Sequence, residues 1–331
     1  MHTGLRPVTA DHAKAINICL TKAKERRNRY IMEHKKNFSY MWLSLFVLLL
    51  VVNLVQIVLG SVFSLISPTI VSSSWFLILC IFFSMHVIGF LVYFLMMKPR
   101  QPQPARGKTK ISPLRFIKIF IICMGATYLF NFISLGINAL ISLIKHAPVS
   151  NPLASIATGD SLILQVLVLS VSAPIVEELI FRKLMLDRLR PYGDMTAIWV
   201  SALAFSLFHG NLSQALYAFV LGLIFAYVVI RTNNILYSIG LHILVNLFGS
   251  AIMPLIALSG NTTLITIAGL LVYVFLIAGI IAFITEKKHI KLNKGEITLT
   301  GFERFKAHYL NIGMALYFIM CGIMFIAAIL V

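Results

Sequence analysis

The sequence contains roughly nine long apolar stretches, and they limit the fold more than any other feature. The chain has 331 residues, of which 59% are hydrophobic and 12% are charged. A bilayer core takes about 20 apolar residues per helix, and the alternating pattern typical of a membrane β-barrel is absent. The sequence therefore predicts an all-α fold, a polytopic transmembrane helical bundle of about eight or nine spans. The predicted spans cover residues 39–66, 75–97, 114–144, 161–190, 195–209, 212–230, 235–257, 263–284 and 309–331.

The positive charges follow the order of the loops. The chain carries 28 Lys and Arg against 11 Asp and Glu, a formal charge of +17. Basic residues gather before the first span and in every second loop after it, whereas loops such as 67–74 and 259–263 carry none. This is the positive-inside pattern. It predicts an integral, multi-pass protein of the cell (plasma) membrane with a cytoplasmic N-terminus, membrane lipid as a partner and no nucleic acid.

The composition predicts four segments. Residues 1–37 form a basic, amphipathic, cytoplasmic arm, which either lies along the membrane surface or is a solvated helix that orients the first span. Residues 38–113 hold two plain spans and a basic linker. Residues 114–285 form a membrane core that carries polar side chains, and residues 286–331 form a basic loop and a last span. If there are nine spans, the C-terminus lies outside the cell.

Only two acidic residues lie inside an apolar span, and they are adjacent: Glu177 and Glu178. Charges at membrane depth are costly and usually have a function. Arg182 follows Glu178 by four residues, the spacing at which side chains meet on a helix. We therefore expect an ion pair between Glu178 and Arg182, which leaves Glu177 unpaired and able to act as a general base. In the alternative interpretation all three residues only brace helices against each other.

Later spans add His209, His242 and Asn246. The breaker Pro191–Asp194 predicts a hairpin, and the helical rise puts Glu177 and His209 each about 20 Å from that turn. His242 and Asn246 are four residues apart and share one helix face. These polar groups are expected to converge on one cavity.

Two chemical schemes suit these residues. In the first, Glu177 and His209 activate a water molecule, while His242 and Asn246 stabilise the oxyanion that forms on a peptide carbonyl. In the second, Glu177, His209 and His242 bind a divalent metal such as zinc, with one position open for water. The residues leave both schemes open, so the cofactor is either a metal or none.

The motifs around these residues resemble those of the CPBP family, which contains the CAAX proteases and bacteriocin-processing enzymes and is also called the Abi family. The family motifs are Glu-Glu-x-x-x-Arg, Phe-x-x-x-His and His-x-x-x-Asn/Asp on successive membrane helices. All three occur here in order, over about residues 160–260. They are Glu177-Glu178 with Arg182, Phe205 with His209, and His242 with Asn246.

The resemblance implies a CAAX-protease-like core within residues 114–285, with a site that opens toward the cytoplasm. It implies catalytic roles for the four residues of the first scheme and supporting roles for Glu178, Arg182 and Phe205. The implied activity is an intramembrane endopeptidase (a hydrolase, glutamate- or metal-dependent). Its substrate would be a membrane-associated peptide or lipidated protein, either a CAAX-type prenyl-protein tail or a peptide precursor.

Two other functions stay open. A non-catalytic membrane protein of bacteriocin-immunity or scaffolding type would keep the polar cluster for assembly. A proton- or ion-coupled transporter would also use intramembrane Glu and His, but the sequence lacks the internal repeats that are common in transporters.

Overall fold

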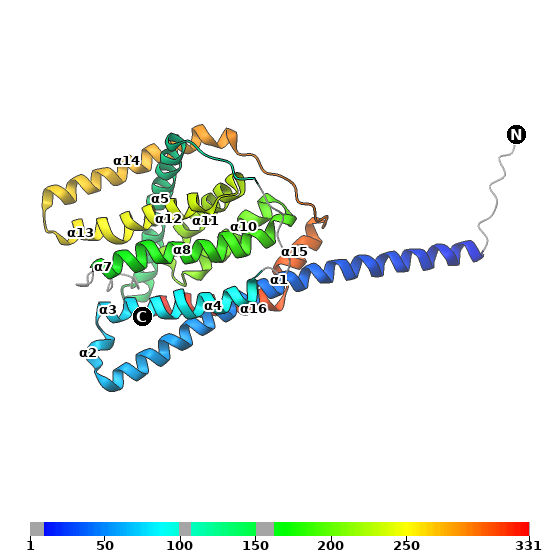
Figure 1. Cartoon of the computed structure of the whole chain (residues 1–331), viewed down its shortest axis with the longest axis horizontal. Coiled ribbons are helices and arrows are strands. Elements are labelled where there is room, and N and C mark those ends of the chain that lie inside the picture. Colours follow the sequence, from blue (N-terminus) through cyan, green and yellow to red (C-terminus); the bar gives the residue numbers. More distant parts are fainter. Residues whose placement is uncertain (1–9, 99–106, 150–161, 331) are drawn as a thin grey trace.

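The chain folds into a bundle of long helices (Figure 1). The computed structural model describes residues 10–98, 107–149 and 162–330, and within these ranges it contains helices and no strands. Eight helical segments in this part of the chain are long and apolar enough to cross a membrane, and Asp194–Phe208 is a shorter apolar helix. The prediction of an all-α bundle with about eight or nine spans is therefore confirmed.

The first span belongs to one uninterrupted helix, α1, which runs from Ala10 to Ile66 over 57 residues. Figure 1 shows its N-terminal part projecting away from the bundle. Arg27 on this part forms an ion pair with Glu303, and His34 Nδ1 lies 2.9 Å from the hydroxyl of Tyr192. Residues 10–37 therefore continue the helix of the first span, and no bend turns them toward the membrane surface.

Two further spans precede the helices that carry the motifs. The second span consists of consecutive segments after the short helix α2 (Pro68–Val71), and the third is α5 (Pro113–Lys145). Ser112 caps α5 by accepting a hydrogen bond from the backbone N–H of Arg115, and Pro113 suits the first helical position, where no N–H is needed. The second span is formed by α3 (Ser74–Ile81), the π-helical segment η1 (Phe82–Gly89) and α4 (Phe90–Met97).

The fourth span and the short helix α10 (Asp194–Phe208) form the expected hairpin. Gly193 at the turn has φ 102°, a backbone conformation that side chains other than glycine rarely adopt. The fourth span alternates between α-helical and π-helical turns. Its segments are α7 (Leu162–Gln165), η2 (Val166–Ser172), α8 (Ala173–Glu178), η3 (Leu179–Met185), α9 (Leu186–Leu189) and the 3₁₀ turn η4 (Arg190–Tyr192).

The remaining helices complete the bundle. Asn211, Asn234 and Asn261 each cap the helix that follows them by accepting a backbone hydrogen bond. The helices are α11 (Leu212–Thr232), α12 (Ile235–Leu247), η5 (Phe248–Ile252), α13 (Met253–Leu258), α14 (Thr262–Glu286), η6 (Lys287–His289), α15 (Gly301–Tyr309) and α16 (Ile312–Leu330).

Four loops rich in basic residues meet at one end of the bundle, which we call the basic end: 107–112, 190–193, 231–234 and 287–300. The backbone N–H of Thr109 donates to the carbonyl of Thr232 at 2.8 Å. Arg190 donates to the side chain of Asn233 at 2.9 Å. At the opposite end of the bundle, Lys145 donates to the carbonyl of Ile329. Every second loop thus lies on one side, as the charge pattern indicated, and α16 ends on the other. The cytoplasmic location of the basic end stays a prediction.

Close backbone contact holds α14 against α5. A Cβ atom placed on Gly279 would lie 2.7 Å from Cα of Gly125, and the reverse substitution would meet Gly279 Cα at 2.8 Å. Small residues allow such approaches between membrane helices, where dispersion contacts replace the hydrophobic effect. Aromatic side chains such as Phe120 and Phe275 fill the space beside this crossing.

Candidate active site

Glu178 lies at the centre of a buried ionic cluster. Its Oε1 is 3.4 Å from Nη1 of Arg182 and 3.1 Å from Nδ1 of His242. The side chains of Glu178 and Arg182 are both completely buried. The contact with Arg182 follows from their spacing on one helix. The contact with His242 spans 64 residues and links α8 to α12, so it could not be read from local spacing.

Glu177 reaches the same imidazole from the other side. Its Oε2 is 3.6 Å from Nε2 of His242, and its side chain is 16% exposed. Glu177 therefore has an imidazole beside it, contrary to the expectation that it is unpaired. His242 lies between two carboxylates, one sealed from solvent and one partly accessible.

Arg182 is enclosed by aromatic rings. Its guanidinium carbon is 4.2 Å from the ring centre of Phe205, 5.6 Å from that of Phe225 and 5.8 Å from that of Phe181. None of its side-chain nitrogens has a hydrogen-bond partner of normal geometry. Cation–π contacts and the charge of Glu178 therefore stabilise this buried cation. Phe205 thus supports the cluster through its ring.

His209 ends α10 next to this cluster. Its Nδ1 lies 2.8 Å from the carbonyl oxygen of Phe205. Because a carbonyl only accepts hydrogen bonds, Nδ1 is the donor and Nε2 of the neutral ring keeps a free lone pair. The Phe205 ring centre is 4.8 Å from the His209 ring and 5.6 Å from the His242 ring, so Phe205 contacts both imidazoles. Glu177 and His209 form no hydrogen bond or ion pair, both residues lying in the described range.

Asn246 lies one turn after His242 on α12 and is half-buried. Its amide nitrogen donates to the carbonyl of Leu169 on η2 at 3.1 Å. An amide nitrogen carries two hydrogens, so one donor remains for another group. Two contacts of this region gave no signal in the sequence: the carbonyl of Leu169, and the ring of Phe225, whose centre is 5.0 Å from that of His242. Both depend on how the helices pack.

The residues do not fit a metal site as they lie. Within residues 10–98, 107–149 and 162–330, no group of three or more His, Cys, Asp or Glu could hold a metal ion. The zinc set expected from the sequence combines Glu177, His209 and His242. In the structure His242 has carboxylates at both ring nitrogens, whereas a catalytic zinc needs three protein donors directed at one point.

A comparison with protein families found one match. Residues 159–248 match the family model described as type II CAAX prenyl endopeptidase Rce1-like. All residues of the three sequence motifs fall inside this region. The searches of curated proteins and of solved structures returned no match.

Proposed function

Because residues 159–248 match the Rce1-like family model, we propose that the chain is an intramembrane endopeptidase of the CPBP family. The family match and the membrane-spanning helices support a membrane protease that acts on a membrane-associated substrate. The proposed reaction is hydrolysis of a peptide bond by a water molecule that Glu177 activates, within the bundle and at the level of His242.

The observation that carries this proposal is the position of His242 between Glu177 and Glu178. Glu178 accepts from Nδ1 and holds the ring in one orientation, in the way that a buried carboxylate orients a catalytic histidine. In the proposed mechanism both ring nitrogens carry hydrogen, so that Nδ1–H donates to Glu178 and Nε2–H is the donor that faces Glu177 and the substrate.

The proposed steps conserve atoms and charge. Glu177 takes a proton from water while the water oxygen bonds to the peptide carbonyl carbon, assisted by the free Nε2 of His209. The oxyanion accepts hydrogen bonds from Nε2–H of His242 and from the second amide hydrogen of Asn246. Glu177 then passes its proton to the leaving amine nitrogen as the C–N bond breaks.

For the substrate we propose a lipidated protein tail of CAAX type or a membrane-associated peptide precursor. A site carried by membrane helices suits a substrate that a lipid chain holds at the same depth. For the protein's location we propose the plasma membrane with the N-terminus in the cytoplasm, in agreement with the basic loops that meet at one end of the bundle.

Cleavage of a prenylated CAAX peptide by the full chain in liposomes tests the proposal. We expect Glu177→Gln to lower kcat by about 10²- to 10⁴-fold, the usual contribution of a general base, and His209→Ala to lower it by a similar or smaller factor. Glu25→Gln, which changes an exposed carboxylate on α1 away from the candidate active site, is the control and keeps full activity. Undiminished cleavage by the Glu177→Gln protein would rule out the mechanism.

The same assay separates the alternatives. A non-catalytic immunity or scaffolding protein keeps its function in Glu177→Gln and loses it only when Glu178 or Arg182 is changed and the fold weakens. Addition of a chelator to the active protein then distinguishes the metal-free scheme, in which activity persists, from the zinc scheme, in which it falls.

A further inference from the structure

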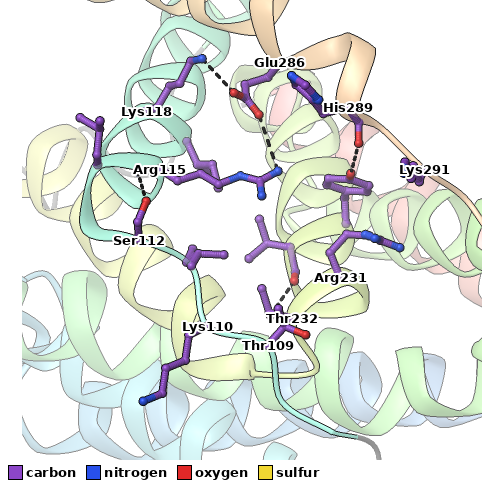
Figure 2. Close-up of a pocket in the computed structure, with 15 residues that line it drawn as sticks. Thr109, Lys110, Ser112, Arg115, Lys118, Arg231, Thr232, Glu286, His289 and Lys291 are labelled. Atoms are coloured by element: carbon purple, nitrogen blue, oxygen red, sulfur yellow. Dashed lines mark hydrogen bonds and ion pairs between the residues drawn. The ribbon is translucent and has the colours of Figure 1, made fainter.

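A cavity lies at the basic end, and neither Glu177 nor His242 lines it. Its volume is about 560 Å³. It is enclosed by the loop before α5, the first turns of α5, the end of α11 and the segment that follows α14 (Figure 2). The lining comes from three segments that are distant in sequence, 109–119, 227–232 and 286–291, and the hydrogen bond from Thr109 to Thr232 joins the first two at the cavity.

The cavity is lined by many more positive than negative charges. Among the described residues that line it, Glu286 is the one carboxylate, and Lys118 contacts it at 2.8 Å and Arg115 at 3.6 Å. Figure 2 shows the guanidinium of Arg115 in the middle of the cavity, whereas the amine of Lys110 turns outward. The cationic lining residues are Lys110, Arg115, Lys118, Arg231 and Lys291.

One carboxylate cannot balance these cations. Both cations nearest to Glu286 share it, and in the described part of the chain no carboxylate lies within ion-pair distance of Arg231 or Lys291. The N-terminus of α5, a helix of 33 residues, adds partial positive charge beside them. The cavity therefore needs an anion, and guanidinium groups match a phosphate with paired hydrogen bonds.

The rim of the cavity is apolar on the side of α5. Leu114 lines the cavity with 77% of its surface exposed, and Ile117 on the same helix is 52% exposed. These side chains continue into the apolar surface of a membrane-spanning helix. The cavity thus combines a cationic interior with an apolar border, the arrangement that an amphiphile with an anionic head requires.

We propose that this cavity binds the phosphate group of an anionic ligand, and that a membrane phospholipid supplies it. The head group lies among Arg115, Arg231 and Lys291, and the acyl chains run along the exposed face of α5. A topology signal alone would require basic residues near the membrane surface. It would not require that three segments distant in sequence line one cavity in which two cations share one carboxylate.

The test uses the full chain in detergent, with phosphatidylglycerol titrated and bound lipid counted by native mass spectrometry. Arg115→Gln/Arg231→Gln is compared with Lys287→Gln/Lys288→Gln, which removes two exposed charges from the adjacent segment outside the cavity lining. We expect the first variant to weaken binding of the first lipid by about tenfold to a hundredfold, since each lost charge-assisted contact accounts for roughly tenfold. The control stays within about twofold of the parent, and Arg115→Lys/Arg231→Lys, which keeps the charges but loses the paired hydrogen bonds, is expected to bind with an affinity between those of the parent and the Gln variant.

Further arms identify the source of the phosphate. Phosphatidylcholine, whose head group is zwitterionic, is expected to bind at least about tenfold more weakly than phosphatidylglycerol. Inorganic phosphate is expected to compete only at millimolar concentration. Equal affinity for both lipids, or equal loss in cavity and control variants, overturns the proposal. Inorganic phosphate that binds as tightly as phosphatidylglycerol overturns the lipid assignment. If the double variant does not fold, the comparison of Lys291→Gln with Lys288→Gln decides by the same criteria.

Discussion

Glu178 and Glu286 can be compared directly, because each is shared by two basic groups: Glu178 by Arg182 and His242, and Glu286 by Arg115 and Lys118. The first cluster has no exposed carboxylate or guanidinium surface, while the side chains of the second are 23% to 48% exposed. Distances in the two clusters are similar, between 2.8 and 3.6 Å. Burial is therefore the main difference between them.

This difference decides what each cluster contributes. Removing one partner from a buried pair leaves an uncompensated charge that water cannot reach, so the Glu178 cluster holds the helices and His242 in one arrangement. Water and ions screen the exposed cluster. Its contribution to stability is small, and its excess of positive charge remains available to a ligand. The buried Glu178 cluster thus fixes the positions of helices, whereas the exposed Glu286 cluster leaves positive charge that a ligand can contact.

The largest expected effect is the loss of Arg182. Arg182→Met leaves Glu178 buried without its cation, and we expect the free energy of unfolding in detergent to fall by about 3–5 kcal/mol. Lys118→Met removes the equivalent partner of Glu286 and is expected to cost about 0.2–1 kcal/mol. Denaturant titration of both variants measures the two values. Equal losses would mean that burial does not distinguish the clusters.

The attachment of α14 to α5 gives the next effect. If the ion pairs of Glu286 contribute little, backbone contact must hold these helices together. Gly279→Leu forces a side chain against Gly125 and is expected to cost about 1–3 kcal/mol. Gly269→Leu, on the same helix with nothing within 4 Å of its Cβ position, is expected to stay within about 0.5 kcal/mol. If the Gly279→Leu protein is as stable as the parent, the ion pairs of Glu286 and not the backbone contact hold α14 against α5.

His308 offers a third kind of group, buried but without a countercharge. It is 2% exposed, and its Nε2 has no hydrogen-bond partner. Burial, with a smaller effect of Arg304, lowers the pKa of His308 from 6.5 to about 3. The unfolded chain therefore binds a proton between pH 6.5 and 3 that the folded chain does not, and stability falls as the pH is lowered through this range. The melting temperature of His308→Phe should vary less with pH over this window than that of the parent.

An exposed histidine controls for this titration. His289→Phe, at the basic end, should show the same pH dependence as the parent. If His308→Phe also follows the parent, then burial of His308 has no effect on the acid sensitivity of the protein.

The smallest effect is expected for Glu286→Gln. It removes the exposed carboxylate between two cations, and we expect a change in unfolding free energy below about 1 kcal/mol that disappears in 1 M salt, where charges are screened within about 3 Å. It should tighten the binding of phosphatidylglycerol, since it raises the net positive charge of the cavity. Weaker lipid binding by this variant would show that Glu286 positions its cations for the ligand.

Much of the fold could be predicted because each helix, turn and intrahelical ion pair depends on residues that are close in sequence. Twenty-residue apolar runs predict helices one at a time, and Pro191–Asp194 predicts its turn from a few residues. The pairing of Glu178 with Arg182 follows from one helical turn. The alternating basic loops also predict that four distant segments lie on the same side. Hydrogen bonds among Thr109, Arg190, Thr232 and Asn233 join three of these segments in the structure.

The parts that could not be predicted depend on packing between helices. The contact of Glu178 with His242 joins α8 to α12, and nothing in either helix alone specifies it. The π-helical turns η2 and η3 flank the two glutamates and change which side chains face the bundle. At the basic end, the sequence shows only a topology signal in the charges of Arg115, Arg231 and Lys291. The cavity between these residues forms only when α5, α11 and the segment after α14 pack together, so it could not be predicted.

The uninterrupted helix α1 determines how far its N-terminal tip lies from the bundle, as well as the direction in which the tip projects. Its residues 10–37 extend about 40 Å at 1.5 Å per residue beyond the part that enters the bilayer, and Arg27 and His34 clamp its base to the bundle. A partner that binds the tip would therefore be held at a fixed distance from the helical bundle. Removing seven residues would shorten this reach by about 10 Å and rotate the tip by only about 20°, so distance could be changed while the presented face stays the same.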